Sequence, residues 1–457
     1  MNALPDILHE ITSQLKSDDK CYLVGGAVRD LVLEREIQDL DFSCNLDPRV
    51  LARRVANRPT ASFFVMDEER KTSRVVLQNP GNTAIVLDFS KLNGSINDDL
   101  RMRDFTFNAM AIDLHDQTRI IDPLMGGRDL HERNLRLCSE TSFMDDPVRV
   151  IRAVRYAADL EMHLEPETLG MLVKTIDRLD QISLERKRDE LFKILDLPES
   201  FRAVLLLQRL EILDKLGLGT DADQLSQLRS LESLLLTFFH REHSVKSESF
   251  KTTVFSSTMA PVKSSLAKTI LTRNSSGHSR YLIDKYFLLI SQGKKEQYPS
   301  RSLEKVFSNE ERNQIELLDT NFDLAQKIFE NQDGINNRNA YQFFRATGEA
   351  GIDLILLSLA KNAAKLAAEL KQDQWIQVVS IGVRLMDVWF NHPEISRPEP
   401  LLNGNEIMCE LNIPPGPLVG RLIDVLKEEQ AAGEIEYKQQ ALSWIKQKSQ
   451  EFTGLLY

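Results

Sequence analysis

Cysteine is scarce in this chain of 457 residues, and long apolar runs are absent. None of the four cysteines lies in a CxxC pair, which argues against a disulfide framework or a zinc site and favours a reducing cytoplasm. No segment approaches the roughly 20 consecutive apolar residues that a membrane span needs. The first 20 residues are amphipathic and carry acids early, unlike a signal or transit peptide. We therefore expect a cytoplasmic protein without a membrane partner.

An excess of positive charge is also absent, since the formal net charge is −11, which argues weakly against a nucleic-acid partner. Residues 261–301 depart from this balance, because they hold eight Lys or Arg against two acids. Such a region inside an acidic protein is suited to a polyanion backbone, and we take Lys263, Lys268 and Arg273 as candidate RNA contacts. A solvated helical face is the alternative interpretation.

Two patterns divide the chain. Residues 20–138 are rich in short β segments separated by Gly, Pro and Asn turns, with one helix near residues 48–57. Long helical patterns follow, and the Ser- and Thr-rich stretch at 243–265 is expected to be a loop or linker. The length alone favours three or four domains. Helices are predicted over residues 147–159, 166–178, 184–195 and 200–211.

The segment YLVGGAVRDLVLEREIQDLDFS, residues 22–43, predicts a strand, a glycine turn, a short helix and a second strand. Gly25 and Gly26 let the backbone approach a ligand closely, and Arg29 follows as a fixed cation. Asp39 and Asp41 stand two residues apart on a strand, so their side chains project from the same face. Carboxylates held this close repel each other unless a cation lies between them, which favours a divalent metal. A loop with incidental acids is the alternative.

A third carboxylate, Asp88, lies in the apolar run AIVLDFSKL, where a buried charge needs a partner. If this strand lies beside that of Asp39 and Asp41, three carboxylates converge. They would then form the ligand set for two magnesium ions that clamp a nucleoside triphosphate. An edge-strand acid that faces water is the alternative for Asp88.

A cluster of charged residues follows in NDDLRMRDFTFNAMAIDL, residues 97–114. Arg101 and Arg103 precede a strand-like run and are able to neutralise phosphate charge near a metal site. Asp104 and Asn108 are candidates for binding a ribose hydroxyl. A solvated turn is the alternative for the whole cluster.

The segment DDPVRVIRAVRYAADL predicts a helix start, because Asp146 is a natural N-cap and Pro147 a natural first-turn residue. Arg149, Arg152 and Arg155 recur every three residues and form a cationic stripe along this helix. An acceptor at Asp146 and a donor at Arg149, on one helix face, are suited to the pairing edge of a base. Surface pairing with neighbouring acids is the alternative for the stripe.

The motifs occur in a fixed order: G-G-x-V-R-D, D-x-D, R-D-F-T-x-N-A, and then an acidic pair followed by x-x-R. In this order they resemble the class II tRNA nucleotidyltransferase and poly(A) polymerase family, closely over about residues 20–215 and more weakly over 400–445. The resemblance implies an α+β protein with an N-terminal DNA polymerase β-type nucleotidyltransferase head and all-helical neck, body and tail. The implied domains are a catalytic head at 1–138, a base-selecting neck at 139–215, and an RNA-binding body at 216–395 and tail at 396–457.

The resemblance also implies roles for the motif residues. Asp39 and Asp41 would be catalytic ligands of Mg²⁺, and Asp88, which rests on its strand, would be a third catalytic carboxylate. Asp146 and Arg149 would act as an amino-acid template for the incoming base. The implied nucleotide-binding residues are Gly25, Gly26, Arg29, Arg103, Asp104, Asn108, Asp146, Arg149, Arg152 and Arg155.

Four features depart from the usual family pattern. Met102 stands where the family usually has the first arginine of R-R-D, Glu34 replaces a glycine, and Asp145 replaces a glutamate. Only Ser90 to Asp98 links the Asp88 strand to the arginine cluster, whereas many CCA-adding members carry a longer flexible loop there. This short link resembles CC-adding members.

We therefore expect an Mg²⁺-dependent tRNA nucleotidyltransferase that adds C from CTP to the tRNA 3′ end. Addition of A from ATP is left open. A bacterial poly(A) polymerase is the alternative within the family. A catalytically silent RNA-binding protein is the alternative of another class, although the intact Asp39-x-Asp41 pair argues against it.

Overall fold

A computed structural model describes residues 7–37, 39–58, 61–67, 72–78, 84–239, 250–290, 302–330, 334–365 and 371–453. The chain divides into two compact units, Met1–Glu190 and Leu191–Tyr457. The boundary between them falls within the neck expected at 139–215. The division into four domains stays a prediction.

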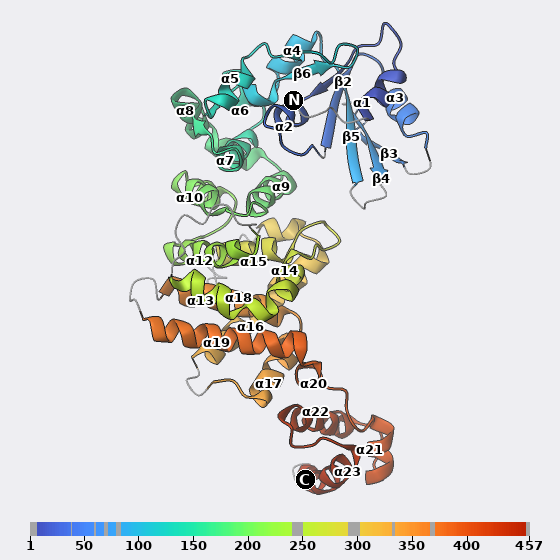
Figure 1. Ribbon diagram of the computed structural model, residues 1–457, viewed down its shortest axis with the longest axis vertical. Helices are drawn as coiled ribbons and strands as arrows, with labels where there is room; N and C mark the ends of the chain where they lie inside the picture. The colour runs from blue at the N-terminus through green and yellow to red at the C-terminus, as the bar shows by residue number, and fades with distance from the viewer. Residues whose placement is uncertain are drawn as a thin grey trace. The chain divides into compact units, whose positions relative to one another are not determined.

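The first unit is built on a seven-stranded mixed sheet in the order β3-β4-β5-β2-β1-β6-β7 (Figure 1). β2 and β5 are parallel, and the other neighbouring pairs are antiparallel. The strands are β1 (Cys21–Val24), β2 (Asp39–Cys44), β3 (Ala61–Asp67), β4 (Thr72–Gln78), β5 (Ala84–Lys91), β6 (Ala111–Asp113) and β7 (Ile120–Ile121).

The two faces of this sheet differ because side chains alternate along each strand. One face is apolar and packs on α3 (Pro48–Val55). On it the rings of Phe42 and Phe89 stack with centroids 4.9 Å apart. The opposite face carries Asp41 and Asp88, which stand opposite each other on β2 and β5. The catalytic candidates therefore project from the face that α3 does not cover.

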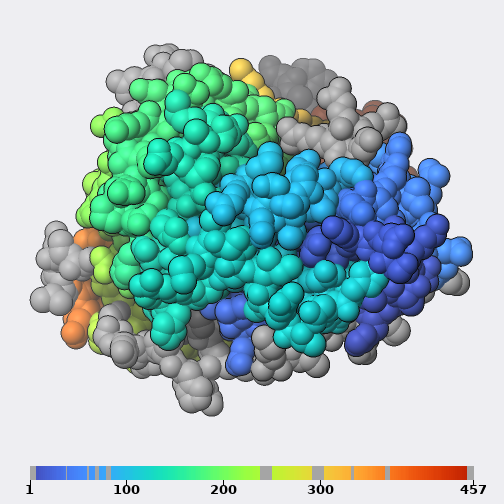
Figure 2. Space-filling view, turned by 90° about the horizontal axis from the view of Figure 1, so that it is seen from above, coloured from blue at the N-terminus to red at the C-terminus, as the bar shows by residue number. Residues whose placement is uncertain are grey.

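Helices follow the sheet within the first unit, and Figure 2 shows the blue strand-rich part and the teal helices adjoining as one surface. Tyr156 packs edge-on against Phe105 and Phe107, with ring centroids 5.7 and 5.2 Å apart, which fixes α7 against the segment that follows Arg103. The helices are α1 (Ile7–Ser13), α2 (Gly26–Val32), α3, α4 (Ile96–Arg101), α5 (Gly126–His131), α6 (Ser142–Asp145), α7 (Arg149–Asp159) and α8 (Pro166–Thr175), and α9 (Leu184–Leu195) crosses the boundary.

The second unit is helical in its described residues. Its last three helices enclose an apolar cluster that includes Leu402, Leu422 and Ile445. The helices are α10 (Phe201–Arg209), α11 (Ile212–Lys215), α12 (Ala222–Phe239), α13 (Phe250–Thr258), α14 (Lys263–Leu271), α15 (Arg280–Leu289), α16 (Asn309–Phe329), α17 (Asn337–Thr347), α18 (Ala350–Lys365), α19 (Gln372–Asn391), α20 (Pro393–Ser396), α21 (Gly404–Leu411), α22 (Pro417–Ala432) and α23 (Lys438–Thr453).

The expected α+β architecture, a strand-rich head followed by helices, is confirmed. Two local expectations were wrong. Residues 250–258 of the Ser- and Thr-rich stretch form helix α13, in which Phe255 is buried. Helix α7 begins at Arg149 and not at Pro147, because residues 147–148 form a turn, within which the Val148 N–H donates to Asp146 Oδ1 at 3.4 Å.

Candidate active site

A glycine turn joins β1 to α2 at the edge of the site. Gly25 has a φ of +76°, which L side chains rarely adopt, and its N–H donates to the carbonyl of Met110 at 3.2 Å. A Cβ atom at Gly25 would lie 2.8 Å from Arg103 Nη1 and 3.6 Å from Asp41 Oδ2. The backbone conformation therefore favours glycine, and a side chain here would displace the Arg103 guanidinium.

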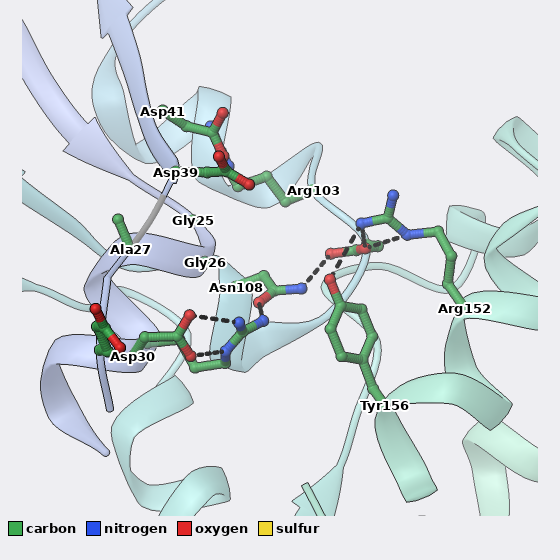
Figure 3. A pocket seen from close by; sticks show the side chains of 13 residues that line it. Gly25, Gly26, Ala27, Asp30, Asp39, Asp41, Arg103, Asn108, Arg152 and Tyr156 are labelled. Carbon is green, nitrogen blue, oxygen red and sulfur yellow. Dashed lines mark hydrogen bonds and ion pairs between the residues drawn. The ribbon is translucent and has the colours of Figure 1, made fainter. Parts of the chain in front are cut away.

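Asp39 and Asp41 lie together on β2, beside the glycine turn and Arg103 (Figure 3). Asp39 is exposed and Asp41 is half-buried. The pKa of Asp41 is raised to about 6, chiefly by burial and also by the charges of Asp88 and Asp39, while Arg103 opposes the shift. A divalent cation between the two carboxylates would relieve this repulsion, and their oxygen donors suit Mg²⁺. The paired aspartates therefore fit the expected metal.

Asp88 lies where its strand was predicted to place it, directly opposite Asp41 on the parallel neighbour of β2. Its carboxylate is engaged by Arg74 of β4, whose Nε and Nη2 donate to it at 2.8 and 2.7 Å. No group of three metal-binding side chains occurs within the described residues. The expected convergence of three carboxylates on metal is thus not seen, because Arg74 neutralises Asp88.

A chain of polar contacts crosses the site from α2 to α7 (Figure 3). Arg29 pairs with Asp30 at 2.8 and 2.9 Å, and its Nη1 donates to Asn108 Oδ1 at 2.9 Å. Asn108 Nδ2 in turn donates to Asp104 Oδ1 at 3.2 Å, and Asp104 Oδ2 pairs with Arg152 Nη2 at 2.6 Å. Arg29, Asn108 and Arg152, which were each predicted to bind nucleotide, are therefore linked through Asp104.

Asp104 is the buried centre of this chain, with a relative exposure of 6%. Burial alone would raise the pKa of Asp104, but Arg152, the Phe105 N–H and Asn108 hold that pKa below its ordinary value. The carboxylate is therefore ionised at neutral pH and already has its partners. In this geometry Asp104 orients its neighbours, and its expected contact with a ribose stays a prediction.

Asp146 and Arg149 are not brought together as a base-facing pair. Asp146 precedes α7, where its carboxylate accepts from Arg186 at 2.7 Å. Arg149 donates to the main-chain carbonyl of Met102 at 3.0 Å and to Ser142 Oγ at 2.8 Å. The expectation that both lie on one helix face was wrong, because the helix begins only at Arg149. Their role as a template stays a prediction.

Most of the predicted site residues line a cavity of about 380 Å³ within the first unit, but Asp88, Asp146, Arg149 and Arg155 do not. Asp30, Glu36 and Tyr156 also line it and were missed by the sequence analysis. Tyr156 follows the arginine stripe directly, and Arg155 lies 4.2 Å from its ring centroid while pairing with Glu190 at 2.9 Å. The lining residues are Gly25, Gly26, Ala27, Arg29, Asp30, Glu36, Asp39, Asp41, Arg103, Asp104, Asn108, Arg152 and Tyr156.

The link after β5 is short and is held by hydrogen bonds. Only residues 92–95 separate β5 from α4. Ser95 and Asp98 form a capping box, and the Asn93 N–H donates to Asp99 Oδ1 at 3.3 Å. Met102, at the family's usual arginine position, is 62% exposed and does not line the cavity.

The basic stretch in the second unit is less cationic at its surface than its composition suggests. Lys285 is fully buried and pairs with Glu232 at 2.9 Å, and Arg280 pairs with the buried Asp353 at 2.5 Å. Arg273 is exposed and pairs with Asp196 at 3.2 Å. Lys263 is half-buried and Lys268 is exposed, and the basic residues at 294, 295 and 301 lie outside the described part of the chain. The RNA contacts expected of this stretch stay a prediction.

A mixed sheet that carries a glycine turn and paired aspartates defines a nucleotidyltransferase head. The family model for the poly(A) polymerase head domain matches residues 21–136, and that for the probable RNA- and SrmB-binding site of polymerase A matches 161–222. The CC-adding tRNA nucleotidyltransferase of Geobacter sulfurreducens is 30% identical over 93% of this chain and 91% of its own. The A-adding tRNA nucleotidyltransferase of Deinococcus radiodurans is 28% identical over 94% of this chain and 96% of its own. The chain therefore belongs to the tRNA nucleotidyltransferase and poly(A) polymerase family.

Solved structures agree on the fold. The Thermotoga maritima CCA-adding enzyme complexed with tRNA superposes with a TM-score of 0.64 at 18% identity, covering 98% of this chain and 96% of its own. Within the described residues, no helix has the length and apolar character of a bilayer span.

Proposed function

We propose that this protein is a cytoplasmic enzyme that adds C residues from CTP to the 3′ end of tRNA without a nucleic-acid template. The observation that carries the proposal is the Asp39–Asp41 pair, held between the glycine turn and Arg103 at the mouth of an arginine-lined cavity. The similarity of the whole chain to CC-adding and A-adding tRNA nucleotidyltransferases supports tRNA as the acceptor.

In the proposed reaction the tRNA 3′-hydroxyl attacks the α-phosphorus of CTP. A phosphodiester bond forms, the bond to the β-phosphate oxygen breaks, and pyrophosphate leaves. Asp39 and Asp41 would hold Mg²⁺, which orients the triphosphate and neutralises its charge when bound. Arg103, against Gly25, would contact the phosphates.

We assign base selection to Asp146 and Arg149. C and A both present an amino group that a carboxylate can accept from, whereas G and U present an oxygen there. Arg186 donates to Asp146 Oδ2 and Arg149 donates to the Met102 carbonyl, so these contacts compete with a base for the pair. The short link at residues 92–95 favours C over A, by likeness to CC-adding members.

Purified protein incubated with Mg²⁺, labelled CTP or ATP, and three RNAs tests the proposal. The RNAs are a tRNA that ends before CCA, a tRNA that ends after CC, and an unrelated RNA. We expect CTP to be incorporated into the first RNA alone. Incorporation of ATP into all three would instead identify a poly(A) polymerase, and no incorporation into any of them would identify a catalytically silent RNA-binding protein.

A further inference from the structure

The sheet face that carries Asp41 continues outward across three more strands. Asp41 of β2 stands opposite Asp88 of β5, Asp88 opposite Arg74 of β4, and Arg74 opposite Phe64 of β3. Cross-strand partners share a face, so these four side chains form one row across the neighbouring strands β2, β5, β4 and β3. Three strand spacings separate the ends of the row, about 14 Å.

The outer part of this row is open to solvent. The side chains of Arg74 and Asp88 are 39% and 34% exposed, and Phe64 is 51% exposed. On the opposite face the neighbouring Phe63 lies 5.4 Å from the guanidinium carbon of Arg53 on α3. Phe63 is thus only half-buried under a helix, although Val65 on the same face is also 40% exposed, whereas Phe64 on the aspartate face is open to solvent.

An exposed aromatic ring beside an arginine has the chemistry of a single-stranded RNA site. Aromatic side chains stack on unpaired bases regardless of sequence, and guanidinium groups bind phosphate. Arginine carries five N–H donors, of which Asp88 engages two, so Arg74 retains the capacity to bind a phosphate. The row is also continuous with Asp41, where the reacting end of the RNA must lie.

We propose that Phe64 and Arg74 bind the unpaired 3′-terminal nucleotides of the RNA being extended. Phe64 stacks on a base and Arg74 contacts a phosphate upstream of the reacting hydroxyl. This inference rests on the proposed function, because it takes the RNA end to lie at Asp41. It accounts for an apolar side chain left exposed on an outer strand of the catalytic sheet, where a protein would otherwise leave an aggregation site.

The test measures the affinity of the full-length protein for two RNA hairpins by fluorescence anisotropy, without nucleotide. One hairpin has a tRNA-like acceptor stem with unpaired 3′ nucleotides, and the other lacks them. Phe64→Ala is compared with Phe64→Tyr, which keeps an aromatic ring, and with Val50→Ala. Val50 is a matched control because it is an exposed apolar residue, 44% exposed, on the helix that covers the opposite face.

We expect Phe64→Ala to raise the Kd for the tailed hairpin about 5- to 100-fold, as stacking on one base predicts, and to leave the blunt hairpin unchanged. Phe64→Tyr should restore the affinity, and Val50→Ala should match the parent. An unchanged Kd for the tailed hairpin, or an equal loss on both hairpins, would overturn the proposal. A change in sedimenting mass without a change in Kd would overturn it too, because the surface then binds a second copy of the chain.

Nucleotide incorporation by the parent protein is measured in parallel. An inactive parent contradicts the proposed function, whereas an active parent with an unaffected Phe64→Ala variant contradicts only this inference.

Discussion

Replacing Arg152 with alanine removes the cation from the buried carboxylate of Asp104. The two side chains are joined by contacts of 2.6 and 3.0 Å, and the Asp104 side chain is 8% exposed. Breaking a buried ion pair costs about 3–5 kcal/mol, because the remaining charge has no counter-ion. Asp104 keeps its hydrogen bonds from Phe105 and Asn108, and Arg152 is 32% exposed. We therefore expect the lower end, about 3 kcal/mol less free energy of unfolding at pH 7.

The loss of unfolding free energy in Arg152→Ala should depend on pH in a defined direction. In the parent the pKa of Asp104 lies below its ordinary value, so the pair stabilises the fold at neutral pH and is lost only as the pH falls through that lowered pKa. Without Arg152, burial raises the pKa of Asp104. The variant then loses stability as the pH rises above the ordinary aspartate value of about 4, and the deficit shrinks as the pH falls towards it.

Calorimetry of the full chain at several pH values measures this difference in stability between the parent and the variant. The unfolding transition of the first unit is the one that is followed. Arg152→Ala combined with Asp104→Asn should be more stable at pH 7 than Arg152→Ala alone, because no charge is left buried. Arg128→Ala is the control, since it breaks an exposed pair with Glu132 and should leave the transition unchanged. A deficit independent of pH, or no rescue by Asp104→Asn, would refute the reasoning.

Three further variants test other parts of the site. Gly25→Ala imposes about 1–2 kcal/mol of backbone strain at a positive φ and displaces the Arg103 guanidinium. Steady-state kinetics should therefore show a raised KM for CTP. An unaltered KM would contradict this expectation. Arg149→Ala should admit GTP and UTP in an incorporation assay, and exclusion as strict as in the parent would show that the template assignment is wrong. Charge reversal of three basic residues in the second unit should weaken tRNA binding and flatten its salt dependence. An unchanged dependence of affinity on salt would support the alternative that this stretch is a solvated helical face. The residues changed to Glu are Lys263, Lys268 and Arg273.

The sheet of the first unit was predictable because each of its strands has a recognisable local sequence pattern. Alternating apolar residues between Gly, Pro and Asn turns mark each strand, and the spacing of Asp39 and Asp41 fixes their common face. The sequence left open whether the Asp88 strand lies beside that of Asp39 and Asp41, and the parallel pairing of β2 with β5 places it there.

The partners of the charged side chains were not predictable, because they come from other elements of the fold. Arg74 lies 14 residues before Asp88 and meets it only through the antiparallel pairing of β4 with β5. Likewise, composition alone does not distinguish an exposed lysine from Lys285, whose charge is buried against Glu232. The Arg149 N–H donates to the Asp146 carbonyl at 3.1 Å, but the two side chains bind different partners, Arg186 and the Met102 carbonyl.

The central proposal is that the Asp39–Asp41 pair directs nucleotide transfer to tRNA, and the sequence of the product tests it most directly. A tRNA that ends before CCA is incubated with Mg²⁺ and all four nucleotides, and its new 3′ ends are read. We predict two added C residues from the parent protein and none from Asp41→Asn, which should still bind tRNA with the affinity of the parent. Runs of A on this and unrelated RNAs, or unchanged addition by Asp41→Asn, would contradict the proposal.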